Sequence, residues 1–229
     1  MDPTPTEQSD AEIKAKPRHW GRYLIRWLFL FVVIPYAAIV CALAIFQRHL
    51  IFPLTKTERL LSKDQQITQG EIKDVSCRTS DGLTLNGWRF RGTQFRDGNA
   101  NAGSDESRPV ILYFPGNAGS RRDRIQDCQE YCSLADEVFL FDYRGYSDNP
   151  GSPSEQGIVN DAHRIWEFVT NEQKIPPKRL LIVGESLGGG VATALTSRLC
   201  REGNSPWGLV VNSTFSSMAD AAATHYPWM

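Results

Sequence analysis

Residues 180–195, LLIVGESLGGGVATAL, pass from an apolar, strand-like run into a helix-like run through a turn of small residues. Ser186 lies at the centre of that turn, and Gly184 and Gly188 stand two residues before and after it. A sharp strand-to-helix corner strains the backbone of its central residue and leaves no room for bulky side chains two residues away. The stretch therefore predicts a strand, a corner that projects the Ser186 hydroxyl at the carboxyl edge of a sheet, and a helix over residues 187–200.

Backbone N–H groups near this corner are the candidates for an oxyanion hole. The helix after Ser186 directs unpaired N–H groups and the positive end of its dipole towards the corner, so the Leu187 N–H is the predicted first donor. A second donor is expected from the loop PGNAGS at 115–120, which follows the apolar run PVILYF, and the Asn117 N–H is our candidate. Gly189 and Gly190 are expected to ease the packing of the helix on the sheet.

Two other uses of glycine-rich turns lack support in the sequence. Neither glycine cluster contains the phosphate-loop pattern G-x-x-x-x-G-K-[ST], and no G-x-G-x-x-G pattern follows the first buried strand. The sequence thus gives no indication of nucleotide or dinucleotide binding. The remaining alternative is that Gly184, Ser186 and Gly188 form a turn that is only structural.

From residue 109 onward, strand-like and helix-like segments alternate. The predicted strands are PVILYF (109–114), EVFLFDY (137–143), RLLIVG (179–184) and WGLVVN (207–212). Continuous apolar runs of this length are typical of strands buried on both faces of a parallel sheet. Because right-handed helical crossovers connect such strands, the pattern predicts an α/β fold with a doubly wound, mostly parallel sheet. Before it, residues 74–92 predict a hairpin around Asp81-Gly82.

Helix boundaries follow from capping residues and apolar spacing. The run Ser152-Pro153-Ser154-Glu155 predicts an N-cap at Ser152 and a helix that begins at Pro153. Its predicted inward side chains are Ile158, Ala162, Ile165 and Val169. The helix before it is expected to bury Ile125, Cys128 and Cys132, and to place Arg121, Arg122 and Arg124 on the other side.

Composition limits the classes of function. The chain has 229 residues, is 41% hydrophobic and carries a formal net charge of −1, so it can bury one sizeable core and gives no indication of nucleic-acid binding. Its cysteines, Cys41, Cys77, Cys128, Cys132 and Cys200, are too few and too scattered for a disulfide framework. For Cys128 and Cys132, which lie four residues apart on a predicted helix, buried free thiols are favoured over metal ligands. We expect no metal and no cofactor.

The N-terminal region predicts a membrane anchor. Residues 27–46 carry no charge, and as a helix they reach about 30 Å, which is the thickness of the hydrocarbon layer. A cleaved signal peptide is the alternative, but the apolar run exceeds the usual length and no clear cleavage site follows. We expect a disordered tail (1–19), an anchor (20–47), a connector (48–71) and an α/β domain (72–229). Closer spacing of basic residues before the span weakly favours a cytoplasmic N-terminus and an extracytoplasmic domain.

Taken together, these stretches resemble the serine α/β-hydrolases, and more narrowly the group with one N-terminal membrane helix. The matching stretches are ILYFPGNAGS (111–120), FDYRGYSDNPGSPSEQGIVNDA (141–162), LLIVGESLGGGVA (180–192) and LVVNSTFSS (209–217). The resemblance implies cleavage of an ester, thioester or amide, with Ser186 as nucleophile and the amides of Asn117 and Leu187 as oxyanion hole. The family's loop usually begins His-Gly, whereas here Pro115 replaces the histidine, which affects loop shape rather than chemistry. Asp142, Arg144 and Tyr146 are expected to fix the neighbouring loop.

The acid and base of a catalytic triad are not evident. In this fold they follow the nucleophile in the order Ser, acid, His. After Ser186 the sequence offers Glu202, Asp220 and His225, and of these only Asp220 and His225 are considered as acid and base. In the family, these two residues follow a later strand and a still later loop. We therefore expect a C-terminally truncated hydrolase domain that is impaired as written.

Two functions are compatible with the sequence. The first is a membrane-anchored serine hydrolase that acts on a small acyl substrate, which the anchor suggests is lipid-like. The second is a non-catalytic, membrane-tethered α/β domain that binds a partner. Replacement of Ser186 by alanine distinguishes them, because only the first function depends on the hydroxyl.

Overall fold

The computed structural model describes residues 20–92 and 108–214, and of residues 47–51 only the backbone. The chain divides into two units, Met1–Gln47 and Arg48–Met229. The predicted tail at 1–19, most of the predicted loop at 93–108, and the segment with Asp220 and His225 lie outside the described residues.

The first unit contains one long apolar helix. It consists of α1 (Trp20–Leu28), a π-helical turn η1 (Phe29–Val33) and the start of α2 (Ile34–Ile51). Within the helix Trp20–Phe46, an 18-residue window reaches a mean hydropathy of 2.8, and the helix is long and apolar enough to cross a membrane. Pro35 lacks a backbone N–H, and the regular hydrogen-bond ladder changes in the π-helical turn that ends two residues before it, at Val33.

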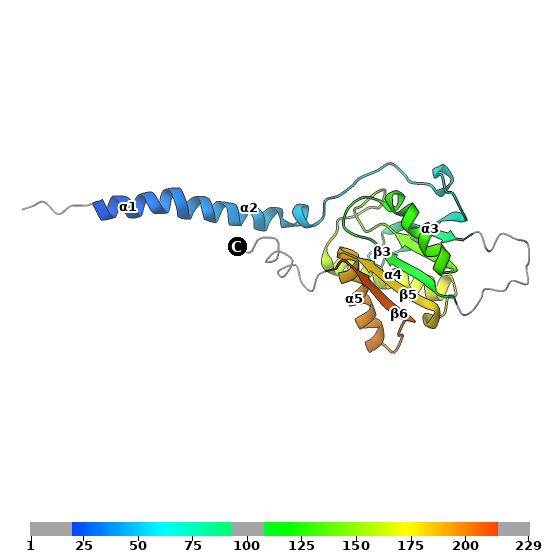
Figure 1. Ribbon diagram of the computed structural model, residues 1–229. Coiled ribbons are helices and arrows are strands. Elements are labelled where there is room, and N and C mark those ends of the chain that lie inside the picture. The colour runs from blue at the N-terminus through cyan, green and yellow to red at the C-terminus, as the bar shows by residue number, and fades with distance from the viewer. Residues whose placement is uncertain (1–19, 93–107, 215–229) are drawn as a thin grey trace, which may run out of the picture. The chain divides into compact units, whose positions relative to one another are not determined.

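The second unit is built on one six-stranded sheet, seen in Figure 1. Its strands are β1 (Glu71–Arg78), β2 (Thr84–Arg91), β3 (Val110–Phe114), β4 (Glu137–Phe141), β5 (Leu180–Glu185) and β6 (Gly208–Asn212), in the order β1-β2-β4-β3-β5-β6. β1 and β2 form the predicted hairpin, and β2 pairs antiparallel with β4. β4, β3, β5 and β6 are parallel, which confirms the mostly parallel sheet predicted from the sequence.

Helices cover both faces of this sheet (Figure 1). On one face, α3 (Ile125–Leu134) follows a short helix, η4 (Arg121–Arg124), and packs its buried cysteines against β2, β3 and β4. On the other face lie α4 (Glu155–Glu167), the π-helical turn η5 (Phe168–Glu172) and α5 (Leu187–Arg201). The short helices η2 (Ser62–Asp64) and η6 (Pro177–Arg179) complete the described elements.

Two local predictions are wrong. Helix α4 begins two residues later than expected, because Ser154, not Ser152, is the N-cap and its side chain accepts a hydrogen bond from the Gly157 N–H. Arg121 does not lie on the outer side of its helix but is buried, with 1% of its surface exposed. The spacing of apolar residues could not reveal this burial, because the charge of the guanidinium is compensated by residues further along the chain, Asp142 at 2.5 Å and Asp148 at 2.6 Å.

The cysteines divide into two groups. Cys128 and Cys132 are buried, as predicted, and Cys77 is buried as well; burial raises the pKa of Cys77 and of Cys132 to about 11. Cys41 and Cys200 are exposed.

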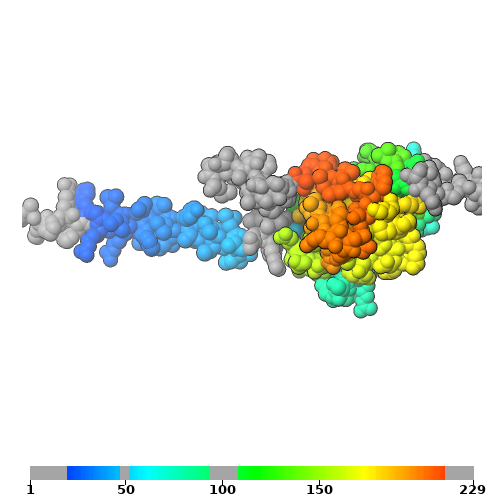
Figure 2. All heavy atoms as spheres, turned by 90° about the horizontal axis from the view of Figure 1, so that it is seen from below, coloured from blue at the N-terminus to red at the C-terminus, as the bar shows by residue number. Residues whose placement is uncertain are grey.

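The outer strand β6 and helix α5 lie next to one another on the surface of the second unit, as the orange residues in Figure 2 show. The apolar side chains of β6 remain exposed among the described residues: Leu209 by 37%, Val210 by 46% and Val211 by 46%. The strand nevertheless matters for the site, because its carboxyl end pairs with the end of β5, where the Ser186 corner begins.

Candidate active site

Ser186 occupies a strained corner between β5 and α5. Its φ of 51° and ψ of −116° lie outside the regions that residues with a side chain normally adopt. Two hydrogen bonds hold this conformation: the Ser186 N–H donates to the Asn212 carbonyl at 2.9 Å, and the Thr214 hydroxyl donates to the Ser186 carbonyl at 2.9 Å. Such strain costs about 1–3 kcal/mol and persists only where the surroundings impose it.

At three positions around Ser186 only glycine fits, because a Cβ there would collide with neighbouring atoms. A Cβ on Gly184 would lie 2.7 Å from the Ala192 Cβ, and one on Gly188 would lie 2.5 Å from the carbonyl carbon of Phe114. Gly189 would collide with Thr214. Gly190 has nothing within 4 Å of such a Cβ, so its predicted packing role is wrong.

The loop after β3 lies directly beside Ser186. A Cβ built on Gly116 would be 3.6 Å from the Cβ of Ser186, which places this loop within reach of a substrate atom bound at the serine. Asn117 follows in that loop and is half-buried, while Leu187 is the first residue of α5. The corner and the loop are thus brought together as the sequence predicts, and the roles of the Asn117 and Leu187 N–H groups stay predictions.

A second loop, residues 142–149 after β4, supports the first one. The buried Tyr143 hydroxyl donates to the Pro115 carbonyl at 2.8 Å, and Tyr146 packs edge-on against the Tyr143 ring. Asp142 accepts a hydrogen bond from the Arg121 N–H at 2.7 Å. Arg144 pairs with Asp81 at 2.9 Å and with Asp161 at 2.5 Å. The predicted supporting role of Asp142, Arg144 and Tyr146 agrees with these contacts.

One charged cluster at the site was not predicted. The Tyr113 hydroxyl donates to the carboxylate of Glu185 at 2.5 Å, and Arg124 lies 3.6 Å from the same carboxylate. Burial, and then the hydrogen bond to Glu185, raises the pKa of Tyr113. A signal existed in the sequence, because a tyrosine within the buried run VILYF needs a partner for its hydroxyl, and Glu185 immediately precedes the serine.

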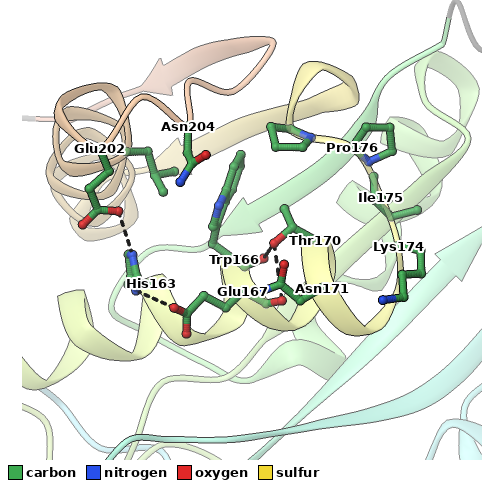
Figure 3. Close-up of a pocket in the computed structure, with 12 residues that line it drawn as sticks. His163, Trp166, Glu167, Thr170, Asn171, Lys174, Ile175, Pro176, Glu202 and Asn204 are labelled. Carbon is green, nitrogen blue, oxygen red and sulfur yellow. Dashed lines mark hydrogen bonds and ion pairs between the residues drawn. The ribbon is translucent and has the colours of Figure 1, made fainter.

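The described histidine nearest in sequence to Ser186, His163, belongs to a different place in the fold. Its ring Nε2 lies 3.1 Å from Glu202 and its Nδ1 lies 3.7 Å from Glu167 (Figure 3). These residues line a pocket of about 370 Å³ between the end of α4 and the end of α5. Since Ser186 is the N-cap of α5 and Glu202 its C-cap, 16 residues later, the two are about 24 Å apart along the helix. His163 and Glu202 therefore cannot serve that hydroxyl.

The triad candidates Asp220 and His225 lie outside the described residues. Within residues 20–92 and 108–214, no group of three or more His, Cys, Asp or Glu side chains could hold a metal ion.

A parallel sheet, a strained serine between strand and helix, and a glycine-containing loop beside it define one class of protein. The chain has the α/β-hydrolase fold and is similar to members of that superfamily. A family model described as the alpha/beta hydrolase fold matches residues 109–207, which contain the loop and the serine corner.

Known relatives agree with this assignment. An uncharacterized protein of Mycobacterium tuberculosis is 40% identical over 157 residues, which are 69% of this chain and 50% of that protein. The lysophosphatidylserine lipase ABHD12 of Danio rerio is 34% identical over 217 residues, which cover 89% of this chain and 56% of that protein. The chain thus spans about half the length of the curated relatives that it matches.

Solved structures share the fold. An alpha-beta hydrolase from Vibrio vulnificus has a TM-score of 0.57 and 24% identity, with 68% of this chain and 50% of that chain covered. The Pyrococcus furiosus esterase Pf2001 has a TM-score of 0.52 and 18% identity, with 77% and 62% covered.

Proposed function

We propose that this protein is a membrane-anchored serine hydrolase that cleaves an ester, thioester or amide bond of an acyl substrate. Ser186 is the nucleophile, and the backbone N–H groups of Asn117 and Leu187 form the oxyanion hole. The observation that carries the proposal is the strained Ser186 backbone, with its φ of 51°, next to the Gly116 loop. Strain of this kind persists at functional corners because the fold imposes it.

The chemistry follows from this geometry. The Ser186 oxygen attacks the acyl carbon and gives its proton to a base, and the negative charge that develops moves to the carbonyl oxygen. Two amides directed at that oxygen stabilise it, each by about 2.7–4 kcal/mol. Helix α5 adds the positive end of its dipole, because it begins at Leu187. The leaving group then departs, and water hydrolyses the acyl-enzyme.

The mechanism also requires a base and an acid that orients it. His225 and Asp220 are the candidates that the sequence offers after the nucleophile, and both lie outside the described residues. Without triad members, the rate falls on the order of a million-fold and only the oxyanion hole and substrate binding remain. A chain that relies on Ser186 alone is therefore an impaired enzyme.

The substrate that we propose is lipid-like. The Danio rerio relative is named as a lysophosphatidylserine lipase, an enzyme of an acyl-bearing lipid. The apolar stretch Trp20–Phe46 supports this choice, since a helix that crosses the bilayer keeps the domain near lipid substrates. The basic residues before the span favour a cytoplasmic N-terminus and an extracytoplasmic domain. Protease protection in sealed vesicles tests that orientation, because a protease added on the cytoplasmic side should then leave the domain intact.

A fluorophosphonate probe tests the proposed nucleophile. The probe labels a serine only where a base activates its hydroxyl. In membranes of cells that express the protein, an adduct mapped to Ser186 by mass spectrometry therefore supports the proposal. Ser186→Ala should abolish labelling, whereas Ser197→Ala, at an exposed serine on the same helix, should not change it. Labelling that survives Ser186→Ala would overturn the proposal.

A second candidate function is a membrane-tethered α/β domain that binds a partner without catalysis. One observation favours it: among residues 20–92 and 108–214, no histidine or carboxylate forms a hydrogen bond with the Ser186 hydroxyl. This alternative predicts that Ser186→Ala leaves the cellular role of the protein intact. The hydrolase proposal predicts that the role is lost.

A further inference from the structure

The segment that follows helix α2 is attached to the domain as a strap. We define the strap as residues 52–60; it begins directly after α2, which ends at Ile51. Phe52 at its start and Leu60 at its end are buried, with 8% and 2% of their surfaces exposed. The sequence predicts only a polar connector here, but the two apolar side chains fix both ends of the strap on the core.

Between its two ends the strap pairs with the loop 142–149. The Ser147 N–H donates to the Thr55 carbonyl at 2.6 Å, and the Thr57 N–H donates to the Ser147 carbonyl at 3.3 Å. The Thr57 and Ser147 hydroxyls are 3.0 Å apart, and the Lys56 ammonium donates to the Asn149 carbonyl at 3.1 Å. Ser147 has a φ of 52°, so the strap holds this loop at a residue whose backbone is itself strained.

A buried ion cluster ties the end of the strap to the same loop. The Leu60 N–H donates to the Asp148 carboxylate at 3.2 Å, and the Leu60 carbonyl accepts a hydrogen bond from Arg121 at 2.7 Å. Arg121 bridges to Asp148 at 2.6 Å and to Asp142 at 2.5 Å. One guanidinium thus joins the strap to both ends of the 142–149 loop.

That loop in turn reaches the residues beside the nucleophile. Its turns are closed by the Tyr146 N–H, which donates to the Tyr143 carbonyl at 3.0 Å, and by the Asn149 side chain, which donates to the Asp142 carbonyl at 2.6 Å. Tyr143 then donates to the Pro115 carbonyl, one residue before Gly116. A continuous set of hydrogen bonds therefore runs from the strap to the loop that carries Asn117.

We propose that the strap is a positioning element of the active site. Residues 55–60 hold the 142–149 loop and, through Tyr143, set the position of the loop 115–120, which carries Asn117. The inference rests on the proposed function in so far as it assigns an effect on rate. The physical basis is that a loop held at several points loses the freedom to move its amides away from the reacting oxygen. A displacement of about 1 Å at such a site costs up to about a hundredfold in rate.

The double variant Lys56→Met/Thr57→Val tests this inference. It removes the two side-chain hydrogen bonds to the loop and keeps side-chain size and the backbone pairing. We expect the maximal rate of fluorophosphonate labelling of Ser186 to fall about tenfold, with the probe concentration at half-maximal rate changed less than twofold. Lys63→Met is the matched control, since Lys63 is exposed three residues after the strap, and labelling should stay at the wild-type rate.

Two further measurements separate positioning from a general loss of structure. Tyr143→Phe removes the last hydrogen bond of the path, so its effect should be non-additive with that of the strap variant. Amide hydrogen exchange should accelerate in residues 115–120 of the strap variant and stay unchanged in β5 and α5. A labelling rate within twofold of wild type, or additive effects, would overturn the inference even where Ser186→Ala abolishes labelling. If Ser186→Ala does not abolish labelling, the proposed function fails, and the exchange of residues 115–120 alone decides the inference: acceleration supports it, and no change overturns it.

Discussion

The parallel strands all end on one side of the sheet, the carboxyl edge, and all begin on the opposite side, the amino edge. These two sides differ in how they are built. At the carboxyl edge the chain is packed backbone against backbone, with a strained Ser186 and glycines that admit no side chain. The amino edge instead carries an open pocket of about 370 Å³, lined by His163, Glu167 and Glu202 on helices (Figure 3). Taken alone, an open pocket and a histidine with two carboxylates would suggest an active site at the amino edge. Imposed strain and close backbone approach indicate that the chemistry belongs to the carboxyl edge.

The charges at the two edges differ in the same way. Near the carboxyl edge, Arg121 is buried between Asp142 and Asp148, and burial raises the pKa of Asp142 against the opposing effect of the guanidinium. At the amino edge, the carboxylate of Glu202 that faces His163 keeps 38% of its surface exposed. Buried charges depend strongly on their partners, whereas exposed ones are compensated by water. The two edges should therefore respond very differently to substitution.

The largest expected effect follows from removing the buried cation. Arg121→Met leaves Asp142 and Asp148 buried without their partner, so we expect the free energy of unfolding to fall by about 3–5 kcal/mol. Urea unfolding followed by circular dichroism measures this loss. Arg122→Met is the control, because Arg122 is the exposed neighbour, and it should change stability by less than about 0.5 kcal/mol. Equal effects of the two variants would mean that the carboxyl edge does not depend on its buried charge.

The next effect concerns the close approach of backbones at the corner. Gly188→Ala places a Cβ 2.5 Å from the carbonyl carbon of Phe114, so helix α5 must move away from β3. We expect a loss of about 2–3 kcal/mol in unfolding free energy. Gly190→Ala, two residues further on and with nothing within 4 Å, should instead stabilise the helix by about 0.5–1 kcal/mol. If Gly188→Ala were neutral in the same urea experiment, the corner would be looser than these contacts imply.

Most of the fold at both edges could be predicted from the sequence. The four parallel strands are short apolar runs, such as VILYF in β3, and burial on both faces gives them a pattern that few other structures share. The corner could also be predicted, because the requirement for small residues around Ser186 is local and leaves its trace in Gly184 and Gly188.

The parts that could not be predicted depend on contacts between residues far apart in the chain. Arg121 looks like a surface arginine until Asp142 and Asp148 fold against it, and the polar strap pairs with a loop about ninety residues later. The same limit applies to Ser154, where two serines fit the capping pattern and only the tertiary path of the chain selects one. Asp220 and His225 stay predictions, since they lie outside the described residues.

A smaller effect, and one that depends on pH, is expected at the amino edge. Glu137 begins β4 and pairs with Arg89 and Arg91. Burial alone would raise the pKa of Glu137, but the hydrogen bonds from both arginines outweigh it and lower the pKa below its ordinary value of 4.5. A lowered pKa stabilises the folded state above that value, and the contribution is lost as the pH falls through the pKa in the folded state.

The test compares Glu137→Gln with wild type by urea unfolding between pH 7 and pH 3. We expect the variant to be less stable by about 1–2 kcal/mol at pH 7, because both arginines lose their carboxylate partner. The loss is smaller than for a fully buried ion pair, because Arg91 is partly exposed and water screens its charge. The difference should shrink as the pH falls below 4.5, where wild type also loses the charge. Glu58→Gln, at an exposed carboxylate, is the control and should change stability by less than about 0.5 kcal/mol at pH 7. A gap that widens on acidification would contradict the sign argued for Glu137.

The smallest effect, and the one that bears most directly on the comparison of the two edges, is expected for His163→Gln. The glutamine keeps a hydrogen-bonding group near Glu202, and the two carboxylates that contact the His163 ring are partly exposed, so stability should fall by less than about 1 kcal/mol. Labelling of Ser186 by a fluorophosphonate should be unchanged, because His163 faces a pocket at the far end of α5. A tenfold slower labelling in this variant would mean that the open pocket communicates with the nucleophile. In that case, the division of the molecule into a reactive carboxyl edge and an inert amino edge would be wrong.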